Sequence, residues 1–210
     1  RPGMLKPVVA LLRGLTDPVS GMSMGQTAEN IAWRFGITRR EMDEYAHRSH
    51  QRLARAQDEG RLAELQALHG PDGRAHEHDD GVRRESTVED LGRLKPVFEK
   101  PYGKVTAGNS AQVTDGACAV MLASEDAVRA HDLPVLARIV DSEWAGLDPA
   151  QMGLGPVHAV TPMLRRHRFA LGSIDYWELN EAFAAQVLAC TAAWRDRGYC
   201  REHLGLSKPW

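Results

Sequence analysis

Three short apolar runs that alternate with helix signals constrain the fold of this chain more than any other feature. The runs are "GACAVMLAS" at residues 116–124, "VLARIVDSEW" at 135–144 and "IDYWEL" at 174–179. Each has the length of a β-strand and is rich in residues that strands favour. Because strand and helix signals alternate here, this part of the chain favours an α/β layer arrangement.

Helix N-termini are marked by side chains that can cap them. Thr38 and Glu41 fit a capping box, and apolar residues then recur at three and four positions until Gly60, which predicts an amphipathic helix of about six turns. Three further helices are expected to begin after Thr27 and close at Gly36, after Ser124, and after Thr161 with Pro162 in the first position.

Composition excludes several classes of protein. The 210 residues are 43% hydrophobic, and the 26 basic and 28 acidic residues form no basic stripe, which argues against a nucleic-acid partner. The apolar runs of the chain are too short to span a membrane, and the N-terminal stretch "RPGMLKPVVALL" lacks a small-residue cleavage site after its apolar run. Three cysteines at wide spacing suit a reducing compartment. We therefore expect a cytoplasmic protein.

Neither the polar stretch 69–89 nor the three cysteines suggest a metal site or a catalytic nucleophile. Residues 69–89 are expected to form a surface excursion, in which the metal-capable side chains of residues 76–80 belong to a solvated loop. Cys118 and Cys190 lie in apolar runs and are expected to be buried. Cys200 lies near His203 but lacks the third, orienting group of a nucleophile and base pair.

The stretch "WELNEAF" at residues 177–183 leaves two interpretations open for Asn180 and Glu181. Both are expected at the carboxyl end of the strand 174–179, where open α/β sheets place their ligands. An asparagine amide can hold a water or a carbonyl oxygen in fixed orientation without adding charge. Alternatively, Asn180 is the N-cap and Glu181 a first-turn acid of the following helix.

Two further segments suit either a ligand or simple packing. Residues 105–117, "VTAGNSAQVTDGA", have small and polar side chains that would let a ligand approach the backbone, or they form a tight loop between two layers. Met22 and Met24, on either side of Ser23, suit an apolar tunnel for an alkyl or pantetheine chain, or they fill the core.

Four motifs follow one another along the chain: "MSMGQTAENIAWRFGITRREMDEYAHRSHQRLARAQDEGR", "LGRLKPVFEKPYGKVTAGNSAQVTDGACAVMLAS", "DPAQMGLGPVHAVTPML" and "ELNEAFAAQ". Together they resemble the thiolase family, the acyl-CoA C-acyltransferases. The resemblance implies an α/β fold, the thiolase α-β-α-β-α sandwich, here incomplete and with a mainly helical inserted loop domain. It assigns residues 1–112 to the CoA-covering loop domain, 113–134 to the closing strand and helix of the first core domain, and 135–210 to the first half of the second.

The resemblance also implies roles for single residues. Asn180 would fix a water in the oxyanion hole for a thioester oxygen, in a reaction that runs through a cysteine acyl-enzyme. The residues expected to contact CoA and its pantetheine chain are Leu15, Met24, Phe98, Ala107, Ser110 and Phe183. The family's nucleophilic cysteine, its Gly-His-Pro histidine and its Cys-x-Gly-Gly-Gly cysteine match nothing in these residues. The chain therefore resembles an internal fragment of a thiolase.

The expected activity is thiolysis of 3-ketoacyl-CoA or Claisen condensation of acetyl-CoA by a homo-oligomer, a dimer or a tetramer, with CoA thioesters as substrates and neither a cofactor nor a metal. Two departures leave chain-length preference open. Ser23 stands where the biosynthetic type usually has a histidine, and residues 108–112 read Gly-Asn-Ser-Ala-Gln in place of Gly-Asn-Ala-Ser-Gly. The alternative is a non-catalytic CoA-binding or assembly subunit that keeps the scaffold without the reactive residues.

Overall fold

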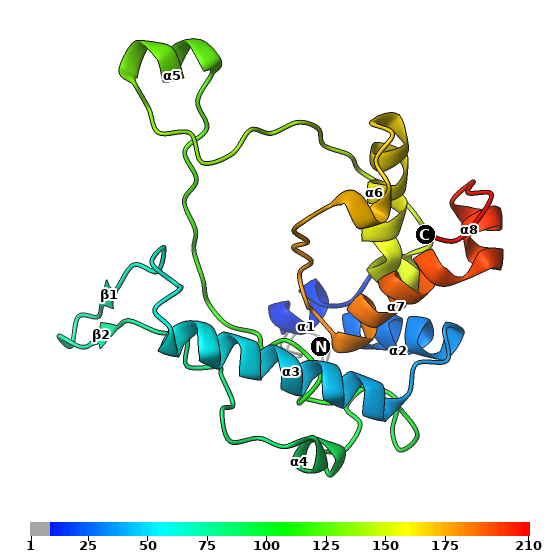
Figure 1. Cartoon of the computed structure of the whole chain (residues 1–210). Coiled ribbons are helices and arrows are strands. Elements are labelled where there is room, and N and C mark those ends of the chain that lie inside the picture. Colours follow the sequence, from blue (N-terminus) through cyan, green and yellow to red (C-terminus); the bar gives the residue numbers. More distant parts are fainter. Residues whose placement is uncertain (1–8) are drawn as a thin grey trace, which may run out of the picture.

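A computed structural model describes residues 9–210 and shows a helical body from which one long segment departs and returns (Figure 1). The α-helices are α1 (Ala10–Gly14), α2 (Met24–Arg34), α3 (Arg39–Asp58), α4 (Val88–Gly92), α5 (Glu125–His131), α6 (Gly155–Arg166), α7 (Ala184–Arg195) and α8 (Arg197–His203). The short 3-10 helices are η2 (Pro149–Leu154) and η3 (Leu171–Ser173). An antiparallel pair joins β1 (Leu68–His69) to β2 (Ala75–His76).

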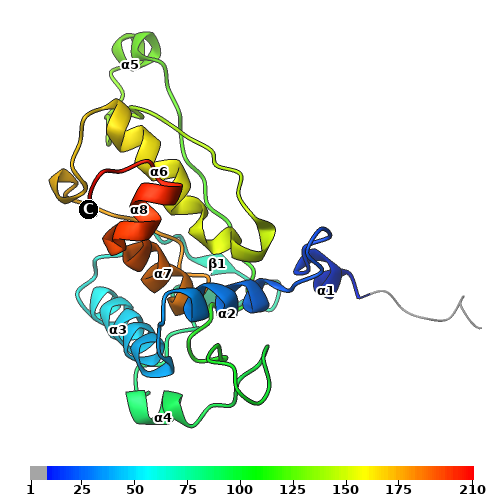
Figure 2. The same ribbon diagram turned by 90° about the vertical axis from the view of Figure 1, so that its right-hand side faces the viewer.

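Helix α7 forms the centre of the body. It is apolar on nearly every side, and such a helix is stable only when other elements cover it. Helices α2, α3, α6 and α8 pack around it, as both views show (Figure 1 and Figure 2). Fully buried side chains come from each of them: Ile31, Met42, Val157, Cys190 and Cys200.

Two of the predicted helix starts are confirmed. Thr38 caps α3 by accepting from the amide of Glu41, whose side chain returns a hydrogen bond to the backbone of Thr38, so the capping box forms as predicted. Ser124 caps α5 by accepting from the amide of Ala127. Gly36 closes α2 with a positive φ of 64°, a conformation that favours glycine.

Two other predicted starts are wrong. Helix α2 begins one turn earlier than predicted, because Ser23 and Gln26 form a capping box and Thr27 lies inside the helix. Helix α6 likewise contains Thr161 and Pro162 in its interior. The Thr161 hydroxyl is buried, donates to Val157 O at 2.7 Å and accepts from Trp194 Nε1 at 3.0 Å, so packing against α7 outweighs the cost of an internal proline.

The three predicted strands do not form. Residues 116–124, 135–144 and 174–179 contain no strand, and the exposed fractions of Val120, Leu136 and Tyr176 are 80%, 98% and 82%. Within residues 9–210 the pair β1–β2 is the only sheet, so the layers of the expected sandwich are absent there. The physical reason is that a strand is stabilised by a neighbour that pairs with its backbone, and these runs have no such neighbour within the described residues.

The same long segment carries a further correction. Cys118 was expected to be buried, but it is exposed, because it lies on the excursion between the body and α5 (Figure 1). Cys190 is buried as predicted. The polar stretch 69–89 is largely exposed, but it also contains strand β2, which its sequence pattern did not predict.

Candidate functional site

Two segments that are distant in the sequence meet beside the first turn of α7. Ser110 and Phe183 face each other in an antiparallel bridge. On either side of the bridge, Ala111 N donates to Ala182 O at 2.8 Å and Ala184 N donates to Asn109 O at 3.0 Å. The loop around residue 110 and the segment that leads into α7 are therefore held together by backbone hydrogen bonds.

Phe98 extends this site toward α2. Its ring meets the ring of Phe183 edge-on, with 6.1 Å between centroids and 84° between planes. Its other side lies on Gly25, where a Cβ atom would come within 2.2 Å of the ring. The neighbouring Met24 N donates to Leu15 O at 3.1 Å. A continuous path of contacts thus joins the expected CoA residues from Leu15 to Phe183.

Ala107 lies at the tip of the turn that precedes Ser110. The side chain of Ala107 is exposed, and the turn is closed by Asn109 N, which donates to Thr106 O at 3.3 Å. The Ser110 hydroxyl points back into the same turn and donates to Thr106 O at 2.6 Å. Of these two residues, Ala107 offers its methyl group outward, whereas Ser110 keeps only oxygen lone pairs for a ligand.

Asn180 lies just before this meeting point. Helix α7 has Phe183 as its N-cap residue and carries no acidic residue in its first turn, so the capping interpretations of Asn180 and Glu181 are wrong. The two side chains differ in their surroundings. Asn180 is exposed, whereas Glu181 is partly buried and accepts from the Ser49 hydroxyl on α3 at 2.8 Å.

The surroundings of Glu181 raise the pKa of its carboxyl group. Burial raises the pKa of this carboxyl above its ordinary 4.5, and the Ser49 hydrogen bond and the charge of Arg48 oppose that rise. Burial also raises the pKa of Tyr45, and the negative charge of Glu181 adds to the rise. The guanidinium of Arg48 lies 4.9 Å from the centre of the Tyr45 ring. Glu181 is therefore an anchor between α3 and the segment that carries Asn180.

Two buried carboxylates behind the loop were missed by sequence reasoning. Glu29 on α2 accepts from the amides of Lys104 and Val105. Asp43 on α3 pairs with Arg39 at 2.7 Å and accepts from Asn109 Nδ2 at 2.9 Å. A usable signal existed, since each is a charged residue among positions of its helix that face the core.

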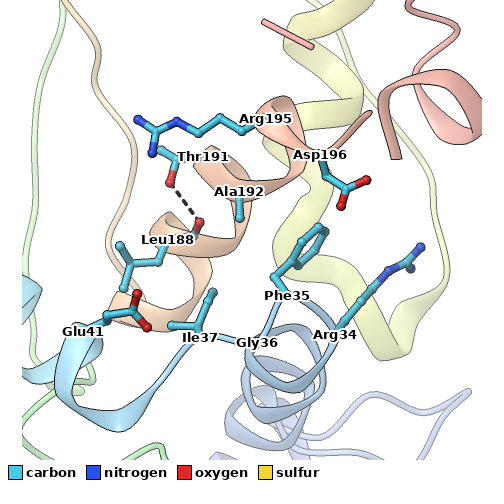
Figure 3. A pocket seen from close by; sticks show the side chains of 10 residues that line it. All are labelled: Arg34, Phe35, Gly36, Ile37, Glu41, Leu188, Thr191, Ala192, Arg195 and Asp196. Carbon is cyan, nitrogen blue, oxygen red and sulfur yellow. Dashed lines mark hydrogen bonds between the residues drawn. The ribbon is translucent and has the colours of Figure 1, made fainter. Parts of the chain in front are cut away.

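The clearest surface pocket lies elsewhere, between the end of α2, the start of α3 and α7 (Figure 3). Its volume is about 460 Å³, and none of the expected site residues lines it. Three of its polar residues already have partners. Glu41 caps α3, Asp196 accepts from Tyr199 N at 2.7 Å, and Thr191 donates to Leu188 O. These three polar side chains are therefore committed to helix caps and local contacts, whereas the guanidinium of Arg195 also lines the pocket.

The buried cysteines do not fit the role of nucleophile. Burial raises the pKa of the Cys190 thiol to about 12, and its Sγ donates to Gly153 O at 3.3 Å. Burial also raises the pKa of Cys200, whose Sγ donates to Trp194 O at 3.2 Å. His203 contacts Arg34 Nη2 at 3.0 Å, so the pair of Cys200 and His203 considered from the sequence is not formed.

The described residues contain neither a cluster of metal-ligating side chains nor a membrane-spanning helix. Across residues 9–210, no group of three or more His, Cys, Asp and Glu side chains converges as metal ligands would. The helices of the same residues are also too short or too polar to cross a bilayer.

Two models of thiolase domains match this chain. The model of the thiolase N-terminal domain matches residues 5–126, and that of the thiolase C-terminal domain matches 133–196. The 3-ketoacyl-CoA thiolase of Shewanella loihica is 46% identical over 176 residues, which cover 81% of this chain and 45% of that protein.

Solved structures extend the likeness to three dimensions. Human mitochondrial 3-ketoacyl-CoA thiolase matches with a TM-score of 0.83 and 43% identity, covering 86% of this chain and 46% of that one, and it has also been solved in complex with CoA. The dimeric peroxisomal thiolase of Saccharomyces cerevisiae gives a TM-score of 0.77 and 38% identity over 88% of this chain and 45% of the other.

The chain spans about half the length of the curated relatives it matches. Over that half, the sequence matches run through the loop around Ser110 and the start of α7. The backbone is thiolase-like, although residues 9–210 form no sheet other than β1–β2. This chain belongs to the thiolase family.

Proposed function

We propose that this chain supplies the CoA-binding surface and the oxyanion-hole asparagine of a thiolase-type acyl-CoA C-acyltransferase. The reaction is thiolysis of a 3-ketoacyl-CoA, or the reverse Claisen condensation of two acyl-CoA molecules. The observation that carries the proposal is the bridge between Ser110 and Phe183. It ties the loop expected to hold CoA to the segment that presents Asn180.

In this proposal the pantetheine chain of CoA lies along the contacts from Leu15 to Phe183. The edge-on pair of Phe98 and Phe183 provides an apolar wall, and the small Ala107 at the tip of its turn lets the chain come close to the backbone. The polar oxygen of Ser110 completes the surface.

Asn180 acts on the thioester oxygen. In both stages of the reaction negative charge develops on this oxygen, and a donor held in place before the reaction stabilises that charge. The exposed amide of Asn180 can donate to a water that in turn donates to the oxygen. The anchor of its neighbour Glu181 on Ser49 keeps the segment in place.

We propose that the nucleophile is a cysteine that is not among the 210 residues of this sequence. Cys190 and Cys200 are buried with raised pKa values, and a thiol reacts as its thiolate. Cys118 is exposed, but it lies on the long segment between the body and α5, away from the contacts that run from Leu15 to Phe183 (Figure 1). By analogy with the dimeric yeast relative, we also propose that the active protein is a homo-oligomer.

The test is Asn180→Ala in the thiolase polypeptide that contains this chain. Loss of an oxyanion-hole donor should lower kcat for thiolysis of acetoacetyl-CoA by about two orders of magnitude, while the KM for CoA changes little. Gln66→Ala removes another exposed amide, outside the site, and serves as the matched control. An unchanged kcat in Asn180→Ala would refute the proposed role.

A second candidate is a non-catalytic subunit that binds CoA, and the burial of Cys190 and Cys200 favours it. Intact mass separates the two candidates, because the residues described by this sequence weigh 23.2 kDa. A heavier native protein with thiolysis activity supports the transferase. A protein of 23.2 kDa that binds CoA without turnover supports the binding subunit.

A further inference from the structure

Glu29 is a buried carboxylate whose hydrogen bonds come from the backbone of a distant turn. Its residue is 1% exposed on α2. Lys104 N donates to its two oxygens at 2.8 and 2.9 Å, and Val105 N donates to Oε1 at 2.8 Å. Gly103 closes over the same group, since a Cβ atom there would lie 2.5 Å from Oε1. Burying a carboxylate is costly unless donors meet it, and here backbone amides do so.

The turn that Glu29 holds joins the two sides of the proposed CoA site. Val97 N donates to Val105 O at 3.0 Å and closes the turn at its base. Phe98 lies at one end of the turn and packs on Gly25, which is one helical turn before Glu29 on α2. At the other end the chain continues from Val105 into the loop with Ala107 and Ser110.

We propose that Glu29 is a positioning residue that sets the distance between Phe98 and the loop of Ala107 and Ser110, and thereby the width of the CoA site. This inference rests on the proposed function, because it assumes that these residues contact CoA. Glu29 itself is covered and does not touch the substrate.

The number and direction of the hydrogen bonds explain why a carboxylate is needed. Two oxygens without hydrogens can accept all three contacts from Lys104 and Val105. A glutamine at this position has the same size but only one acceptor oxygen, and its NH₂ group would face the amides as a donor against donors. The turn would then have to move away from α2.

The experiment measures CoA binding by isothermal titration calorimetry, with wild type, Glu29→Gln and Phe183→Ala compared in the full chain. We expect Kd to rise at least tenfold in both variants. Val157→Ala is the control for general loss of stability, because it opens a cavity in the core on α6 and leaves the turn intact. Its Kd should equal that of wild type.

Amide hydrogen exchange in the same variants measures how well the hydrogen bonds of the turn are protected. Exchange at Lys104 and Val105 should be at least tenfold faster in Glu29→Gln than in Val157→Ala. An unchanged Kd or unchanged exchange in Glu29→Gln, with weakened binding in Phe183→Ala, overturns the role of Glu29 alone. No CoA binding by wild type, or no effect of Phe183→Ala, overturns the proposed function and this inference with it.

Discussion

At the scale of single residues, Asn180 and Glu181 show how adjacent polar side chains take different parts. The asparagine is exposed, and the glutamate is half-buried against Ser49. One is left for solvent or substrate, while the other connects its segment to α3. The sequence pattern could place both beside a helix start but could not separate them, because the separation depends on a side chain of another helix.

The raised pKa of Glu181 leads to a pH-dependent prediction. A carboxyl whose pKa is higher in the folded than in the unfolded chain stabilises the fold when protonated, and this contribution is lost as pH rises from 4.5 through the folded pKa. Glu181→Gln stays neutral and can still accept from Ser49. We therefore expect the variant to have a higher free energy of unfolding than wild type at neutral pH and the same one well below pH 4.5.

Urea denaturation at the two pH values measures this difference. Glu178→Gln changes an exposed carboxyl on the same segment and is the matched control, whose free energy of unfolding should stay close to that of wild type. If Glu181→Gln were less stable than wild type at neutral pH, the Ser49 contact would outweigh the burial of the charge.

The sequence resemblance names the residues of the candidate site, but it does not name the residues that hold them in place. Phe98 and Phe183 were expected to share one surface, and their rings do touch. Glu29, Asp43 and Gly25 act through partners far along the chain, and single-sequence periodicity carries no information about such partners.

At the scale of helices, local signals succeeded where the stabilising partner is close in sequence. The capping box of Thr38 is complete within four residues, so it could be read directly. Thr161 looked like a similar cap, but its hydroxyl bonds to Trp194 on another helix. The runs 116–124, 135–144 and 174–179 failed as strands for the same reason, since a strand depends on pairing with a distant segment.

The cap of α2 gives a prediction at this scale. Ser23 accepts from Gln26 N and satisfies a helix-terminal amide, so Ser23→Ala should lower the free energy of unfolding by about 1 kcal/mol. Ser23→Gly is the conservative comparison, because glycine at an N-cap costs only a few tenths of a kcal/mol. Thermal or urea denaturation resolves the two. Equal losses in both variants would contradict a capping role for the hydroxyl.

At the scale of the whole molecule, the long segment that contains the runs 116–124 and 135–144, on either side of α5, exposes apolar side chains. The exposed fractions of Met121 and Ile139 are 84% and 72%, and unpaired apolar segments of this kind bind other chains. We expect the isolated chain to self-associate, and the double substitution Met121→Lys with Ile139→Lys to reduce that association. Sedimentation velocity measures it.

The control for added charge places two lysines at Leu65 and Gln66, which are exposed and lie outside that segment.

 The control variant is therefore Leu65→Lys with Gln66→Lys, which adds the same charge and should leave the association of wild type unchanged. A wild-type chain that stays monomeric under all conditions would contradict the expected association.

The central position of α7 has a consequence for the evolution of the two matched segments. The two thiolase domain models divide the chain between residues 126 and 133, yet α2 and α3 lie on one side of that division and α7 on the other. Ile31 and Met42 share one core with Cys190, so each stretch covers the apolar surface of the other. Either of the two matched segments could be duplicated or exchanged between genes as a unit of sequence. Neither segment would then carry the complete hydrophobic core, because that core contains residues of both.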